Sequence, residues 1–352
     1  AQGPVCSFCV VRTCENRFMA QQATLKRNAA VGGIFVLFCF VRAFHPSVIK
    51  ASITTLPDGS EGYAYDPVGP VILKNFLVCI CAELVAFCIY GRKAWIETWN
   101  WTAILVFGIN GILFAFDDYL EMQSLGKMHG VAYIILNQSK ILITVFLLMP
   151  FKGIYQSRLQ WILLITLMGA MTLYMCITTS GEKSSSRIAI EAYLFTLMKV
   201  TFSCLAAVYT DKYAKAFAKT VALPVQIAQT YFVRTCVALV LSGLTPRIWA
   251  DGFFHDWDTY TVMVVVSFGI KSSMSFTVLA VLDAILKNIA ECVAVLLLFF
   301  YEVLAPWTAF EFNICSFLSV IIILLLILAY VDSQVVVAKS NKFDGQVVNA
   351  GT

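Results

Sequence analysis

The chain has 352 residues, of which 60% are hydrophobic and only 13% are charged. This composition excludes an ordinary soluble globular protein and predicts an all-α membrane protein with several spans, surrounded by membrane lipids. The formal net charge is only +4, and the sequence contains no basic run or nucleic-acid motif. We therefore expect no nucleic-acid partner.

Apolar segments long enough to cross a bilayer, roughly 20 residues each, recur along the chain. Residues 1–28 lack the continuous apolar core of a secretory signal and are expected to form an N-terminal tail. The polar residues 333–352 are expected to form a disordered C-terminal tail. Between the tails we predict ten transmembrane helices, over residues 29–48, 70–91, 101–120, 128–150, 159–179, 187–211, 222–244, 258–282, 284–304 and 312–332.

Lysine and arginine are distributed unevenly between the predicted loops, and this asymmetry sets the orientation of a membrane protein. If the N-terminus is cytosolic, 13 of these residues fall on the cytosolic side and at most five on the other. Both tails are therefore predicted to be cytosolic, or stromal in a plastid.

A polar linker over residues 180–186 divides the ten spans into two sets of five, over residues 29–180 and 187–332. Because five is odd, the second set must enter the membrane in the opposite orientation to the first. The predicted architecture is a 5+5 inverted repeat, which places a substrate site near the membrane midplane between the two sets.

Two lysines, Lys140 and Lys287, lie inside apolar stretches at corresponding places in the two sets. A charge inside a membrane span costs several kcal/mol unless it faces a polar cavity, so the two lysines predict a cationic site. The alternative is that they pair permanently with buried acids. Glu291 follows Lys287 by four residues, on the same helical face, and keeps that alternative open. The other candidate acids are Asp117, Asp118 and Asp283.

The sequence has no nucleotide-binding glycine loop and no Ser/His/Asp constellation, so we do not expect an enzyme. Of its twelve cysteines, only Cys6, Cys9 and Cys14 have a spacing that is typical of a metal site or a redox pair. A single C-x-x-C without a second pair of ligands is a weak signal. We therefore predict neither a metal nor a cofactor.

Several short motifs occur in the order found in one family of membrane carriers. Residues 133–144 resemble the signature Y-x-x-x-x-Q-x-K-I-L-x-T, and residues 157–161 resemble S-x-x-Q-W. Residues 206–215 are similar to G-V-Y-x-E-K-x-L-K, residues 229–231 to Q-x-Y, and residues 283–287 to the end of K-Y-x-D-N-I-x-K. Together they resemble the nucleotide-sugar transporters, particularly the branch that carries CMP-sialic acid, UDP-galactose and UDP-N-acetylglucosamine.

The resemblance implies a carrier of the drug/metabolite transporter superfamily in the Golgi or endoplasmic-reticulum membrane. Such a carrier is an antiporter that exchanges a nucleotide-sugar for a nucleoside monophosphate by alternating access. One alternative is a related carrier of sugar phosphates or other organic anions in a plastid or other organelle membrane. A second alternative is a non-transporting structural subunit that inherited the carrier fold. A homodimer or a larger membrane complex also stays open.

Three places depart from the family pattern. In the third span, Asp117 and Asp118 stand where the family has neutral amides, and the eighth span gains Lys271. Before the ninth span, Ala280 and Val281 replace the family's Lys-Tyr. The two acids could balance the lysines, take up a co-transported proton or contact a sugar hydroxyl. Arg42, Lys199 and Arg234 lie nearer span ends, where such side chains reach towards the interface.

The expected site combines these residues with the matched motifs. Lys140 and Lys287 are expected to bind phosphate, with Tyr133 and Tyr231 near the base, while Gln138 serves either the substrate or a neighbouring helix. Substrate contacts are expected from Lys140, Lys287, Tyr133, Tyr231, Gln229, Asp117, Asp118, Gln138 and Lys271. Gating or structural roles are expected for Glu83, Asp211, Lys212, Asp283 and Glu291.

Overall fold

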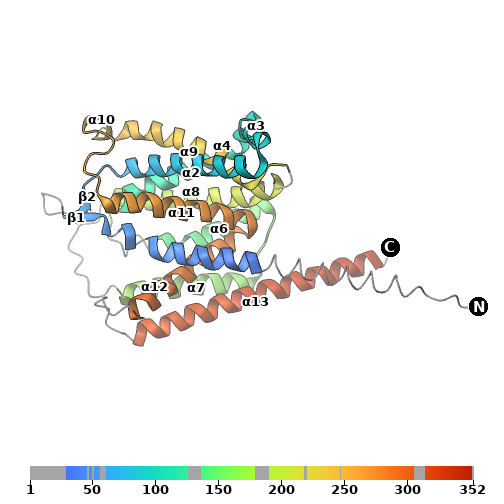
Figure 1. Cartoon of the computed structure of the whole chain (residues 1–352). Helices are drawn as coiled ribbons and strands as arrows, with labels where there is room; N and C mark the ends of the chain where they lie inside the picture. Colours follow the sequence, from blue (N-terminus) through green and yellow to red (C-terminus); the bar gives the residue numbers. More distant parts are fainter. Residues whose placement is uncertain are drawn as a thin grey trace, which may run out of the picture.

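The computed structural model describes residues 29–45, 47–49, 51–55, 61–125, 136–178, 190–217, 220–245, 247–304 and 314–350. Most of these residues form α-helices that run side by side along one direction (Figure 1). The tail over residues 1–28, the linker over 180–186 and Tyr133 lie outside the described residues.

The long helices account for most of the predicted spans. They are a helix over Ala29–Ile49, α2 (Val68–Tyr90), α4 (Trp101–Leu125), α6 (Lys140–Lys152), α7 (Arg158–Thr178), α8 (Ile190–Phe217), α9 (Leu223–Leu241), α11 (Thr259–Val281), α12 (Ala284–Leu304) and α13 (Ile314–Ala350). Short elements connect them: β1 (Ile53–Thr55), β2 (Glu61–Tyr63), α3 (Arg92–Thr98), η1 (Ser242–Leu244) and α10 (Arg247–Ala250). The two strands are antiparallel, with Ile53 opposite Tyr63.

Eight helices within the described part of the chain are long and apolar enough to cross a membrane. The prediction of an all-α membrane protein is therefore confirmed. Each of the ten predicted segments contains a helix, but α6 covers only Lys140–Lys152 and the apolar part of α7 covers only Arg158–Tyr174, so neither is among the eight. Ten spans in a 5+5 arrangement therefore stay a prediction.

The ends of the helices follow local sequence signals in some places and not in others. Asp258 accepts a hydrogen bond from the Thr261 backbone N–H at 2.7 Å, which caps the start of α11. At the other end of the chain, the expectation of a disordered tail from residue 333 is wrong, because α13 continues to Ala350. The apolar first part of α13 nucleates the helix, and residues 333–350, which contain no proline, can extend it without a second nucleation step.

The main helix contacts join the two predicted sets of spans. α4 packs against α8 and α9, α2 packs against α9 and α11, and α7 packs against α13. The approach of α4 to α9 is close because Gly111 has no side chain: a Cβ there would lie 2.6 Å from the Thr230 carbonyl oxygen. The centre of the bundle is thus built by both sets.

Candidate functional site: a buried charge cluster

Eleven charged side chains meet at the centre of the bundle and are buried or nearly so. We call them the central cluster. They come from every long helix except α7 and α13. The cations are Arg42, Lys74, Lys140, Lys199, Arg234, Lys271 and Lys287, and the acids are Asp117, Asp118, Glu121 and Glu291.

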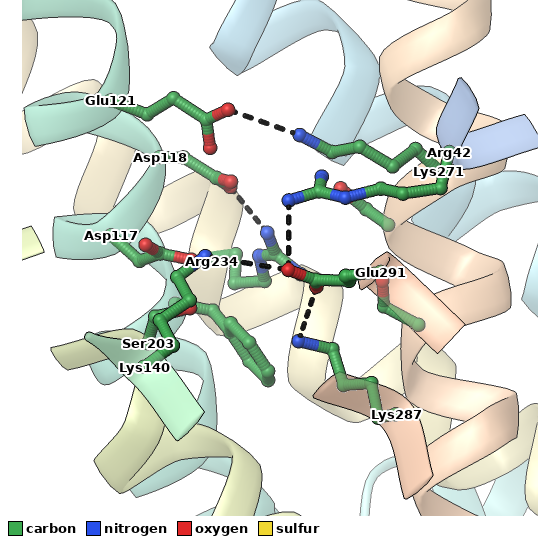
Figure 2. A pocket seen from close by; sticks show the side chains of 13 residues that line it. Arg42, Asp117, Asp118, Glu121, Lys140, Ser203, Arg234, Lys271, Lys287 and Glu291 are labelled. Carbon is green, nitrogen blue, oxygen red and sulfur yellow. Dashed lines mark hydrogen bonds and ion pairs between the residues drawn. The ribbon is translucent and has the colours of Figure 1, made fainter. Parts of the chain in front are cut away.

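Glu291 in α12 is the meeting point of three cations (Figure 2). Its carboxylate lies 3.0 Å from the Lys287 ammonium, one helical turn before it, as the sequence spacing predicts. Arg42 approaches it at 3.3 Å and Lys140 at 3.9 Å, both from helices of the first set. One carboxylate therefore joins both predicted sets of spans.

A second group forms around Glu121 in α4. Lys199 of α8 lies 3.6 Å from this carboxylate, and Lys271 of α11 lies 3.4 Å from it. The Lys199 ammonium also lies 4.0 Å from the Asp117 carboxylate and donates a hydrogen bond to Asn137 at 3.1 Å. A single acid again connects helices from the two sets.

The third group is centred on Asp118. Lys74 of α2, which is fully buried, donates to it at 2.7 Å, and Arg234 of α9 donates to the same oxygen. The Arg234 guanidinium also lies over two aromatic rings, 4.4 Å from the centroid of Tyr231 and 4.9 Å from that of Phe114. Such cation–π contacts and a paired carboxylate are the groups that make a buried guanidinium tolerable.

The central cluster holds more positive than negative charge: its seven cations exceed its four acids by three. The side chains leave a cavity of about 30 Å³ between them, which is room for one or two waters. Oxygen atoms of Asp117, Asp118 and Glu121 lie within 4.8 Å of one another. The lysines and Arg234 beside these acids supply positive charge where a metal ion would lie.

The structure brings together most of the predicted charged residues. Lys140, Lys287, Asp117, Asp118 and Lys271 all belong to the central cluster, together with Glu291. These six residues line one cavity, and a role for them in binding substrate stays a prediction.

The predicted neutral residues lie elsewhere. Tyr231 is fully buried beneath Arg234, and the structure does not place it on the wall of the central cavity. Gln229 lines a separate apolar cavity together with Glu83. Gln138 is half-buried in the residues that precede α6, and Tyr133 lies outside the described residues.

The remaining predicted residues lie beyond the central cluster, where α8 and α11 end. Asp211 pairs with Lys152 at 2.6 Å, which joins the two sets, whereas Lys212 is exposed. Asp283 accepts a hydrogen bond from the Leu286 N–H at 2.8 Å and caps α12. Burial raises the pKa of the Asp283 carboxyl.

Sequence reasoning missed five members of the central cluster. The expectation that Arg42, Lys199 and Arg234 extend towards the membrane surface is wrong, because each is paired with an acid of the central cluster. No role was predicted for Lys74 or Glu121. Glu121 had a usable signal, since it follows Asp117 by four residues and therefore shares its helical face.

A bundle of apolar helices around a buried cluster with excess positive charge is typical of a membrane carrier for an anionic solute. Residues 80–331 match the nucleotide-sugar transporter family, and the chain belongs to that family. The resemblance noted from the motifs is thereby confirmed.

Individual relatives agree with this assignment, and a solved structure shares the fold. The chain is 21% identical over 285 residues to UDP-galactose translocator 1 of Caenorhabditis elegans, covering 75% of this chain and 79% of that protein. It is 24% identical over 264 residues to CMP-sialic acid transporter 1 of Arabidopsis thaliana, covering 70% and 75%. A crystal structure with 12% identity superposes with a TM-score of 0.61 over 89% of this chain and 98% of the other, which shows a shared fold.

Proposed function

We propose that this protein is an antiporter that exchanges a nucleotide-sugar for a nucleoside monophosphate across a Golgi or endoplasmic-reticulum membrane. The observation that carries the proposal is the excess of three positive charges in the buried central cluster. A phosphate or diphosphate that leaves water needs cations to replace its hydration. The central cluster supplies them inside a member of a nucleotide-sugar transporter family.

The acids of the central cluster have a role in this proposal. A buried cation without a counter-ion is strongly unfavourable, so the empty carrier needs carboxylates to hold its lysines. Glu291 occupies the position between Arg42, Lys140 and Lys287 that a substrate phosphate would take. Binding then exchanges one anion for another, and lysine suits this exchange because it is a point charge that releases phosphate again.

The packing of the helices supports alternating access between two related halves. In an inverted repeat, each contact has a counterpart between the equivalent helices of the other half. In the predicted repeat, α2 corresponds to α9, α4 to α11 and α7 to α13. The contact of α4 with α9 therefore corresponds to the contact of α11 with α2. The contacts α2–α9 and α7–α13 each join two equivalent helices and correspond to themselves. Rocking of residues 29–180 against residues 187–332 would expose the central cluster to each side in turn.

The proposal is tested by transport into liposomes. The purified protein is reconstituted in vesicles preloaded with nucleoside monophosphates, and uptake is measured for a panel of radiolabelled nucleotide-sugars and sugar phosphates. We expect saturable uptake of one nucleotide-sugar that depends on the internal nucleotide. Lys140→Ala and Lys287→Ala should each lower it about tenfold or more, which corresponds to ~1.4 kcal/mol or more of lost binding.

The matched control is Lys93→Ala, which removes a lysine whose side chain is 84% exposed, outside the central cluster. Its uptake should equal that of the parent protein. Uptake of sugar phosphates alone would replace the proposal with an organic-anion carrier. Equal uptake by the two lysine variants and the parent protein would remove the central cluster from the binding site.

One observation favours a second candidate, a structural subunit of a membrane complex. All members of the central cluster are paired with one another, and the cavity between them is only about 30 Å³, far smaller than the few hundred Å³ of typical ligand sites. This candidate predicts no exchange of any anion by folded protein. It also predicts that the protein co-purifies with partner subunits.

A further inference from the structure

A second cavity, of about 250 Å³, lies on the side of the bundle where α3 joins α2 to α4. We call it the lateral cavity. Several of its apolar walls are exposed, including Leu84 at 59%, Trp95 at 48% and Trp99 at 47%. In a membrane protein such a surface faces lipid. Its lining residues are Cys79, Ile80, Glu83, Leu84, Trp95, Thr98, Trp99, Ile104, Gln229 and Phe232.

The lateral cavity is almost entirely apolar, yet it contains a carboxyl group. Thr98 donates a hydrogen bond to one oxygen of Glu83 at 2.8 Å. The other oxygen, Oε1, is buried and has no hydrogen-bond partner among the described residues. A buried acceptor without a donor costs about 1–3 kcal/mol, and more when it is charged. The carboxyl therefore requires a donor that the described side chains do not supply.

Gln229 supplies a second buried acceptor without a donor in the lateral cavity. Gln229 is only 1% exposed, and its amide nitrogen donates to the carbonyl oxygens of Glu97 at 3.0 Å and Thr98 at 3.1 Å. These two bonds fix which end of the amide is nitrogen. The amide oxygen, Oε1, is consequently an acceptor, and it too is buried without a hydrogen-bond partner in the described part of the chain.

Aromatic rings form another part of the wall. The Trp99 ring centroid lies 6.1 Å from that of Trp95 and 5.3 Å from that of Phe232, both in edge-to-face arrangements. Aromatic faces attract cations, most strongly when water is excluded. Tryptophan is also enriched at the level of lipid head groups, which agrees with the position of α3 between the ends of two spans.

These features select the chemistry of a ligand. Two acceptors without donors require a group with at least two N–H or O–H bonds, and the carboxyl and aromatic rings favour a positive charge. A primary ammonium has three N–H donors and a positive charge, whereas a trimethylammonium has no donor and a sterol hydroxyl has one donor and no charge. We propose that the lateral cavity binds the primary ammonium head group of a membrane lipid, phosphatidylethanolamine.

The proposal is independent of transport and of the substrate in the central cluster. Its test is native mass spectrometry of the whole purified protein in mixtures of phosphatidylethanolamine and phosphatidylcholine with identical acyl chains. These two lipids differ only at the head-group nitrogen, which carries three hydrogens in phosphatidylethanolamine and three methyl groups, with no donor, in phosphatidylcholine. We expect phosphatidylethanolamine to be retained about fivefold or more over phosphatidylcholine, as hydrogen bonds to a charged group would give.

Two variants locate the binding. Glu83→Gln keeps the shape and removes the charge, and it should lower the preference to nearly one. Trp99→Leu keeps an apolar wall and removes an aromatic face, and it should lower the preference to a lesser degree. The matched control is Glu97→Gln, which removes an acid of the same short helix α3 whose side chain does not line the lateral cavity. It should leave the preference unchanged.

Each result decides the proposal. Equal retention of the two lipids by the parent protein overturns it, as does an undiminished preference in a folded Glu83→Gln variant. Folding is checked by the melting temperature in detergent. If Glu83→Gln does not fold, the comparison of Trp99→Leu with Glu97→Gln takes its place. Glu83-dependent binding of a sterol in preference to both lipids would replace the ammonium with a hydroxyl group.

Discussion

The two ends of the helix bundle hold the predicted halves together by different chemistry. At the end where α11 finishes, Asp211 of α8 pairs with Lys152 of α6 at 2.6 Å and with Lys215 at 2.5 Å. Lys215 also donates to the carbonyl oxygen of Leu282. We call this the ionic end. One buried carboxylate there connects α6 of the first set to α8 of the second.

The end where α11 begins is closed by apolar contacts and lies beside β1 and β2 (Figure 1). Tyr63 and Tyr65, with ring centroids 5.3 Å apart, belong to one buried cluster with residues of α11. Trp257 belongs to the other set and packs so close to Gly69 that a Cβ there would lie 3.2 Å from its ring. We call this the aromatic end.

The difference suggests which end opens more readily. The side chains of Lys152 and Lys215 are 19% and 37% exposed, so water can replace Asp211 as their partner. Opening the aromatic end would expose large rings to water, at a cost of roughly 25 cal/mol per Å². In a carrier that works by alternating access, we therefore expect the ionic end to separate at the lower cost.

The largest expected effect is at the aromatic end, in Tyr65→Ala. Tyr65 is 2% exposed, and burial raises its pKa to about 12, so the neutral phenol is part of the packing. Removing a buried aromatic ring costs about 3–5 kcal/mol, which should appear as a large fall in melting temperature in detergent. Tyr65→Phe keeps the ring and loses only the 3.0 Å hydrogen bond to Ser52, which is worth about 1 kcal/mol. Similar losses in the two variants would contradict the role of the ring.

A smaller effect is expected at the ionic end, in Asp211→Asn. Because both partner lysines can reach water, we expect a loss of no more than about 1.5–3 kcal/mol, the range for hydrogen bonds to charged groups. A double-mutant cycle with Lys152→Met isolates the pair, and its coupling should account for much of that loss. The control is Asp256→Asn, which removes an acid that is 46% exposed beside the aromatic end and should change stability little. Additive losses in the cycle would show that the 2.6 Å contact contributes no stability.

Several parts of this arrangement follow from the sequence. Hydrophobic length alone limits where a chain can cross a membrane, so the helices lie where the apolar segments predict them. Lys140 and Lys287 stand out because charges inside spans are rare and need a cavity. Glu291 follows from the geometry of one helix, since a residue four positions after Lys287 shares its face.

The rest depends on helix rotation and depth, which neighbouring helices decide. Gln229 and Arg234 are five residues apart in α9 and therefore point roughly 140° apart around it. Gln229 reaches the lateral cavity and Arg234 reaches the central cluster. The sequence does not say which face is which, because both offer polar partners. Lys74 likewise resembles a lysine at the start of a span, and only the packing of α4 and α11 around α2 buries it.

The smallest expected effect distinguishes the two ends by pH. Asp258 begins α11 beside the aromatic end, and hydrogen bonds from the Thr261 hydroxyl and backbone N–H lower its pKa. A lowered pKa contributes stability that is present above the unfolded value of about 3.9 and is lost as pH falls through the folded value. Asp283 follows α11 at the ionic end, and burial raises its pKa. Its contribution has the opposite sign, because it is present at low pH and is lost as pH rises through the folded value.

Melting temperatures measured from pH 7 to pH 3 test this difference. Asp258→Ala should lose about 1 kcal/mol at pH 7, the usual cost of removing an N-cap, and the loss should shrink as the pH falls. Asp258→Asn keeps a capping oxygen without the charge, so its smaller deficit should also vanish at low pH. Asp283→Asn removes an acid whose charged form is disfavoured by burial, so its stability relative to the parent protein should improve as pH rises. Parallel pH profiles for the Asp258→Asn and Asp283→Asn variants would contradict the opposite signs, because then burial and hydrogen bonding would act alike at the two ends of α11.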